Sequence, residues 1–214
     1  MQRTKFGMAI ALLAGTLIGC SRPASVMTYE AAGSLADPTA VELRLAMRKL
    51  WSEHVIWTRD YIVAAAAAHP SAPAVSRRLL RNQEDIGNAI TPYYGAAAGS
   101  SLTALLKDHI LIAVDLVAAA KAGDAAKKED ADRRWHTNAG DIATFLSRAN
   151  PNWSRQMLLD MLNEHLTLTT QEAVARLESR WDDDIATFDR IHAQSLRMAD
   201  ALTEGIVKQF PAKF

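Results

Sequence analysis

The chain lacks the residues that would give it disulfides or a charged binding surface. It contains a single cysteine in 214 residues, so no disulfide can form within it. Its 24 basic and 24 acidic residues balance, which excludes the broad basic surface of a nucleic-acid-binding protein. Runs of strand-favouring β-branched residues are scarce, while alanine and leucine are abundant. These absences favour an all-helical fold held together by an apolar core.

The first 19 residues have the pattern of an export signal. Arg3 and Lys5 supply a positive start, and an apolar segment from Phe6 to Ile18 follows. This segment is too short to span a bilayer comfortably, which is typical of a signal peptide rather than a transmembrane helix. Its removal leaves 22 basic residues against 24 acidic ones, so we expect no strong attraction to anionic lipid.

A lipid-attachment sequence closes this segment. Leu17-Ile18-Gly19-Cys20 resembles a bacterial lipobox, in which the cysteine thiol is lipidated and the preceding peptide is removed. The alternative is an ordinary secretory signal with an incidental cysteine. Ser21, rather than aspartate, in the next position points to the outer membrane of a Gram-negative cell. We therefore expect an envelope protein that faces the periplasm and whose partner is the membrane, through an N-terminal lipid anchor.

The remainder divides into a tether and one helical domain. Residues 20–36 mix Ser, Ala, Pro and Gly without a helical period, which is typical of a flexible tether. Asp37 before Pro38 then predicts the start of a helical-bundle domain that covers residues 37–210. Apolar residues recur at three- and four-residue spacing in six segments, four of them long. Breaks between the segments lie near Pro70, 91–100, Gly123, Asn150 and 180. We expect an antiparallel bundle of about six helices.

An internal duplication is also indicated. With an offset of 56 residues, six positions from Asn82 to His109 match six positions from Asn138 to His165. The segment Asp184–Phe188 repeats the letters of Asp141–Phe145. We interpret the pattern as a repeated unit of one short and one long helix, although shared helical periodicity accounts for part of it.

Four histidines fall on the apolar stripes of different long helices, where side chains face a core. They are His54, His109, His165 and His192. Each has a carboxylate close by in the sequence, and these neighbours are Glu53, Asp108, Glu164 and Asp189. Imidazoles with carboxylates inside a bundle could bind a divalent transition metal, or the imidazoles could bind haem. The spacing is less favourable, because a carboxylate directly before a histidine points about 100° away around the helix.

The alternative interpretation is a structural polar layer. In that case each inward histidine pairs with a polar group of a neighbouring helix. Four more residues would belong to the same polar network: Arg59, Asp85, Asp141 and Asp184. Such a layer would fix the order and register of the helices, since unpaired buried polar groups are costly. No nucleophile elbow or specific carboxylate pair is present, so we expect no catalytic residues, and an enzyme of unknown class is the third alternative.

Three segments carry a family resemblance. They are Glu53-His54-Val55-Ile56-Trp57-Thr58-Arg59, Asn82 to Ala89, and Ala199 to Pro211. In these segments the chain resembles a family of small bacterial helical proteins that has no settled activity. Some members carry the label acetylglutamate kinase. The resemblance implies a helical fold over nearly all of the mature domain, but this sequence has no Gly-rich loop between a strand and a helix for binding phosphate.

Overall fold

The computed structural model describes residues 39–214. The signal peptide at 1–19, Cys20 and the tether at 20–36 lie outside the described residues, so the lipid anchor stays a prediction. No helix between residues 39 and 214 is both long and apolar enough to cross a membrane.

The described residues confirm the all-α fold and contain no strand. The five α-helices and one short 3₁₀ helix are α1 (Ala40–Ala66), α2 (Ala72–Ala122), α3 (Ala125–Ala149), α4 (Arg155–Leu177), α5 (Trp181–Gln209) and η1 (Pro211–Lys213).

Local sequence explains the helix boundaries. α1 begins three residues later than Asp37, because Thr39 and Glu42 form a capping box that satisfies backbone N–H groups at both residues. The Asp124 and Ser154 side chains cap α3 and α4. Each accepts a hydrogen bond from the backbone N–H of the residue three positions further along, Lys127 and Met157 respectively. Gly123 ends α2 with a left-handed φ of 69°, as expected for glycine after a helix.

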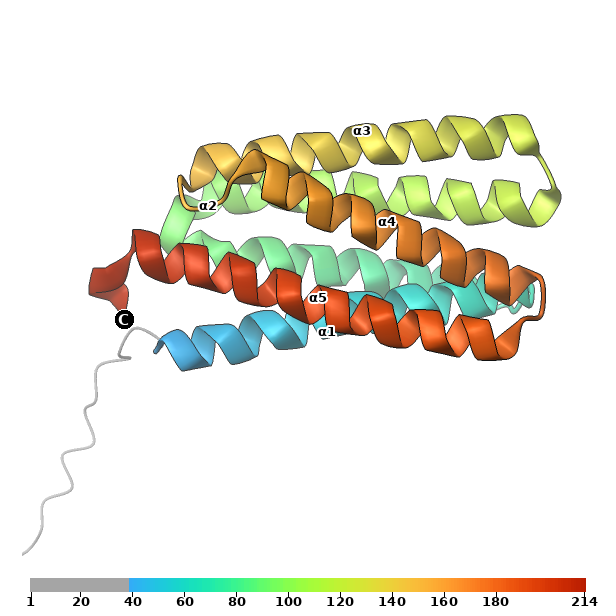
Figure 1. The fold of residues 1–214 in the computed structure, drawn as a ribbon, viewed down its shortest axis with the longest axis horizontal. Coiled ribbons are helices and arrows are strands. Elements are labelled where there is room, and N and C mark those ends of the chain that lie inside the picture. The colour runs from blue at the N-terminus through green and yellow to red at the C-terminus, as the bar shows by residue number, and fades with distance from the viewer. Residues whose placement is uncertain (1–38) are drawn as a thin grey trace, which may run out of the picture. The chain divides into compact units, whose positions relative to one another are not determined.

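The helix count differs from the predicted six because α2 spans two of the predicted helices. The predicted turn at 91–95 is helical except at Gly95, which has φ 83° and ψ 165°. The chain reverses there, and Figure 1 shows the two halves of α2 running side by side in opposite directions. Glu84 and Lys107 form an ion pair between the halves, and a Cβ on Gly99 would lie only 2.7 Å from the Gly87 carbonyl oxygen. Small residues therefore allow this close approach.

The helices pack as three antiparallel hairpins. Hairpin 1 consists of α1 and residues 72–94, hairpin 2 of residues 96–122 and α3, and hairpin 3 of α4 and α5. α5 also packs on α1, and α3 packs on α4, so hairpin 3 lies against both other hairpins (Figure 1). One large apolar core fills the space between them, with Met47, Ile86, Trp135, Leu166 and Ile206 among its fully buried side chains.

Candidate functional site

Three buried histidines meet where the three hairpins come together. His54 lies on α1, His109 on the second half of α2, and His165 on α4. The His54 and His165 ring centroids are 5.6 Å apart, and those of His109 and His165 are 6.4 Å apart. The three side chains are 2–4% exposed. We call these residues the histidine triad.

Each triad residue contacts a side-chain amide of its own hairpin. The pairs are His54 with Gln83, His109 with Asn138, and His165 with Gln194, at 3.2, 2.8 and 3.2 Å from the ring Nδ1. The two partners are 29 residues apart in every pair. The three amides were absent from the predicted site, and this constant spacing is the sequence signal that could have identified them.

Backbone contacts of the amides fix the ring tautomers in two pairs. The Asn138 amide donates through Nδ2 to the Leu105 carbonyl at 3.0 Å, and the Gln194 amide donates through Nε2 to the Met161 carbonyl at 2.9 Å. The amide oxygens therefore accept from Nδ1–H of His109 and His165, so each of these rings keeps a lone pair on Nε2.

The first pair has the opposite polarity. The nitrogen of the Gln83 amide faces Nδ1 of His54, so this ring accepts and carries its proton on Nε2. The same nitrogen also lies 2.8 Å from the Leu79 carbonyl oxygen and 3.1 Å from Asn82 Oδ1. Two hydrogens thus serve three acceptors, and Gln83 Oε1 is buried with no hydrogen-bond partner among residues 39–214. Hairpin 1 therefore satisfies its polar groups less completely than hairpins 2 and 3.

Burial keeps the triad neutral. Desolvation lowers the pKa of His109 to about 3 and that of His165 to about 4, and it holds the pKa of His54 well below its usual value. The neighbouring imidazoles lower the pKa of His54 and His109 further. Three neutral rings at pH 7 are suited to hydrogen bonding or to metal ligation, and none is poised to exchange a proton near neutrality.

The predicted carboxylate partners do not join the triad. Asp108, Glu164 and Asp189 are exposed, and Glu53 lies at the surface beside Lys49 and Arg78. Glu164 pairs instead with Arg197 on α5. For Glu53, Asp108 and Glu164 the physical reason is the helical rotation between adjacent residues, which turns a carboxylate away from the core when the next residue faces inward. Asp189 lies one turn before His192, which is itself only half-buried.

The fourth predicted histidine lies apart from the other three. His192 is half-buried, and its Nε2 lies 3.1 Å from the Ser52 hydroxyl. Its ring stacks on Phe188. Within the described residues, no three His, Cys, Asp or Glu side chains are arranged to hold a metal ion. The expected grouping of four histidines with four carboxylates is therefore not formed.

A second buried polar cluster joins α1, α4 and α5. Arg59 donates to Glu172 at 2.6 Å and to Asp184 at 2.8 Å, and Arg176 donates to Asp184 at 3.2 Å. Both carboxylates are 1% exposed. Of the predicted polar network, Arg59 and Asp184 lie here, while Asp85 is only half-buried and Asp141 is exposed on another part of the bundle. The cluster ties hairpin 1 to hairpin 3.

Glu172 is a member of this cluster that the sequence reasoning missed. It lies seven residues after His165, on the same inward face of α4, so the helical period could have identified it. Burial raises the pKa of Glu172 to about 7, although the charge of Arg59 opposes the shift. It is therefore a buried carboxyl that titrates near neutral pH.

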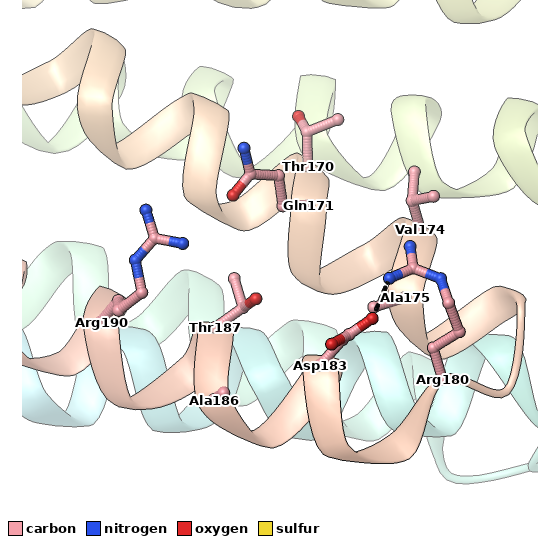
Figure 2. Close-up of a pocket in the computed structure, with 9 residues that line it drawn as sticks. All are labelled: Thr170, Gln171, Val174, Ala175, Arg180, Asp183, Ala186, Thr187 and Arg190. Atoms are coloured by element: carbon pink, nitrogen blue, oxygen red, sulfur yellow. Dashed lines mark hydrogen bonds and ion pairs between the residues drawn. The ribbon is translucent and has the colours of Figure 1, made fainter.

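A surface hollow on hairpin 3 does not resemble an active site. It is an open groove of about 390 Å³ between the end of α4 and the start of α5, lined by Thr170, Gln171, Arg180, Asp183 and Arg190 among others (Figure 2). Arg180 is neutralised by Asp183 at 2.5 Å and by Glu178 at 2.8 Å. No nucleophile and base lie within hydrogen-bonding distance of each other in this groove.

The space between the helices is too small for an organic ligand. Two internal cavities have volumes of about 20 Å³ each. A cavity of this size has room for roughly one water, whereas small-molecule sites measure about 300–1,000 Å³.

The class that fold and site define is a helical bundle of three hairpins with a buried histidine–amide layer. No protein-family model matches the chain, and no curated protein or solved structure matches it either. The resemblance to a family of small bacterial helical proteins therefore stays a prediction.

Proposed function

We propose that this protein is a lipid-anchored envelope protein whose folded part is a non-catalytic scaffold. In this proposal the histidine–amide layer sets the register of the hairpins, and any partner binds to the outer surface. The observation that carries it is the repeated pairing of each triad histidine with an amide 29 residues further along. A constant spacing is what a register device requires, because it defines which turns of two helices face each other.

The surroundings of the layer support a structural role. The Asn138 and Gln194 amides use both their nitrogen and their oxygen in hydrogen bonds within the protein. The carboxylates beside the triad in sequence are outside the core, where Glu53 and Glu164 pair with cationic side chains. Cavities of about 20 Å³ leave no space for haem. These features leave little at the triad with which a substrate could react.

The alternative is a transition-metal-binding bundle, and the tautomers of two histidines favour it. His109 and His165 donate from Nδ1 to an amide oxygen, which is how metal-ligating histidines are commonly oriented. The absence of a metal-ready group of three ligands among residues 39–214 weighs against it. A metal would have to move at least one side chain to complete its coordination.

Thermal melting distinguishes the two functions. With a structural layer, the melting temperature of the full chain is the same in chelator and with Zn²⁺, Cu²⁺, Co²⁺ or Ni²⁺. His109→Ala then melts lower in every condition, because it leaves Asn138 unpaired. His136→Ala is the matched control, since His136 is exposed. A metal that raises the wild-type melting temperature, but not that of His109→Ala, would replace the scaffold with a metal-binding function.

The envelope location has its own test. Cys20→Ala should leave the helical domain folded but move the protein from the membrane fraction to the soluble periplasmic fraction, since a thioether-linked lipid would no longer form. Ser21 supports the outer membrane, so wild-type protein should sediment with outer-membrane markers. A Cys20→Ala protein that stays in the membrane fraction would contradict lipid anchoring.

We also propose that the predicted internal repeat is a repeat of hairpins. In each hairpin the carbonyl four residues before the triad histidine accepts from an amide of the facing helix: Leu50 from Asn82, Leu105 from Asn138 and Met161 from Gln194. In hairpins 2 and 3 this amide also pairs with the histidine, whereas in hairpin 1 the neighbouring Gln83 does so. If α2 is counted as two helices, this arrangement corresponds to six helices in three pairs. A protein made of two copies of hairpin 3 joined in tandem would test it. This protein should form helical oligomers if the hairpins are interchangeable.

A further inference from the structure

We propose that the histidine triad makes the bundle acid-sensitive, so that protonation separates the hairpins from one another while hairpins 2 and 3 each stay paired. This inference concerns the folded domain alone and goes beyond its proposed role as an anchored scaffold. It is relevant to an exported protein, because a domain outside the cytoplasm experiences the pH of its surroundings.

The contacts of the triad are of two kinds, some within a hairpin and some between hairpins. The hydrogen bonds of the three rings lie within hairpins, as in His109 with Asn138. The ring-to-ring contacts lie between hairpins: His54 on hairpin 1 and His109 on hairpin 2 both approach His165 on hairpin 3. A positive charge on two adjacent rings therefore acts across a boundary between hairpins.

The groups that surround the triad offer almost no compensating charge. From the helices packed around it, the side chains that contact the rings are Trp51, Gln83, Trp135, Asn138 and Gln194, all neutral. Glu164 is the one carboxylate whose charge favours protonated His165, and it is exposed and paired with Arg197. The half-buried His192 contacts Ser52 and Phe188, and neither of these residues belongs to the triad. Imidazolium ions formed here would repel one another in a dry environment.

The hydrogen bonds inside hairpins 2 and 3 are compatible with protonation. His109 and His165 already donate from Nδ1, so a proton added at Nε2 leaves both bonds to the amide oxygens intact. The new charge therefore weakens the packing between hairpins without removing the pairing within these two. This difference is the physical basis for separation at the boundaries between hairpins.

The expected response is steep because unfolding takes up several protons. An unfolded histidine has a pKa near 6.5, while the pKa of His109 is about 3 and that of His165 about 4 in the folded protein. At pH values between about 4 and 6.5, the unfolded state therefore binds up to three more protons at the triad than the folded state does. Glu172 acts in the opposite direction, because its raised pKa of about 7 makes the folded state hold one proton that the unfolded state releases above about pH 4.5. A net uptake of about two protons predicts that the unfolding constant rises roughly 50- to 100-fold per pH unit between pH 6 and 5.

Urea denaturation of the full chain carrying Cys20→Ser, measured from pH 7.5 to 5, tests the response. His109→Gln retains a donor for Asn138 but cannot be protonated, so its unfolding constant should rise roughly tenfold less per pH unit. His136→Gln replaces an exposed histidine and should follow the wild type. The same steep dependence in His109→Gln, or a flat wild-type dependence, would overturn the proposal.

Two measurements on folded protein keep the test independent of how well His109→Gln folds. In wild-type protein, ring-proton NMR signals of the triad should not shift between pH 7.5 and 6, because burial keeps the three rings neutral. Spin labels at Ile56 and Leu111, exposed residues on hairpins 1 and 2, should show a broader distance distribution at pH 5 than at pH 7.5. Labels at Gln171 and Ile185, both exposed on hairpin 3, should not. Triad signals that shift between pH 7.5 and 6, or label pairs that broaden together, would overturn it.

Discussion

The Asn138 side chain on α3 makes two hydrogen bonds to α2. Its amide oxygen accepts from His109 Nδ1–H at 2.8 Å, and its amide nitrogen donates to the Leu105 carbonyl at 3.0 Å. Asn138→Ala should lower the free energy of unfolding by about 2–4 kcal/mol, since it leaves the buried Nδ1–H of His109 unpaired and removes a second hydrogen bond to the Leu105 carbonyl. Urea denaturation at pH 7.5 measures the change. Thr137→Ala, at the exposed next position, should change it little, and equal losses in the two variants would contradict the role of this amide.

Arg59 neutralises two buried carboxylates at once. Arg59→Met should reduce the free energy of unfolding by about 3–5 kcal/mol at pH 7.5, because it leaves Glu172 and Asp184 with less compensating charge in the core. Arg180→Met is the control, since Arg180 pairs with Asp183 and Glu178 at the surface and should show no detectable change in chemical denaturation. A loss in Arg59→Met no larger than that in the control would show that the carboxylates are hydrated.

Glu172 should give the unfolding free energy a pH dependence opposite in sign to that of the triad. Its pKa is raised to about 7 by burial, so the stability it contributes is present below its unfolded pKa near 4.5 and is lost as pH rises through 7. Glu172→Gln removes this titration. From pH 5 to 8 the wild type should lose roughly 3 kcal/mol relative to the variant, as measured by denaturant titration at each pH. A difference between the two proteins that is constant with pH would mean that Glu172 is not desolvated.

Gly99 is located where the two halves of α2 meet. A Cβ there would lie 2.4 Å from Thr91 Oγ1 and 2.7 Å from the Gly87 carbonyl oxygen, so Gly99→Ala should lower the free energy of unfolding by about 1–3 kcal/mol. Gly140→Ala is a matched control inside α3, where the nearest atom to a new Cβ is 3.7 Å away. It should raise stability by about 0.5–1 kcal/mol through helix propensity. Thermal melts of both variants give the comparison, and a stable Gly99→Ala would show that the two halves can separate without loss.

The sequence predicted the parts of this fold that depend on neighbouring residues. Period and capping signals predicted the helical class, and glycine or proline indicated the region of every connection except the one at 178–180. The inward direction of His54, His109 and His165 followed from the apolar stripes of their helices. The outward direction of Asp108 and Glu164 follows from the same rotation, although both were included in the predicted site.

The polar partners were harder to predict because they lie on other helices. Gln83, Asn138 and Gln194 reach the triad only because each hairpin places residues 29 apart at the same level. Glu172 could be placed on the inner face of α4, but its ion pair with Arg59 depends on how α1 packs against α4. A helical period defines a direction around one axis and contains no information on the distance to the next axis.

By itself, the sequence determined the helical class, the turn that ends at Gly95 and which side chains face inward, because these depend on dihedral preferences and hydrophobic period within a few residues. Only the tertiary structure decided that three histidines rather than four meet, and that amides rather than carboxylates contact them. These features depend on the register between helices, which is fixed by close packing at positions such as Gly87 and Gly99 and by the cost of burying a charged group that has no partner of opposite charge.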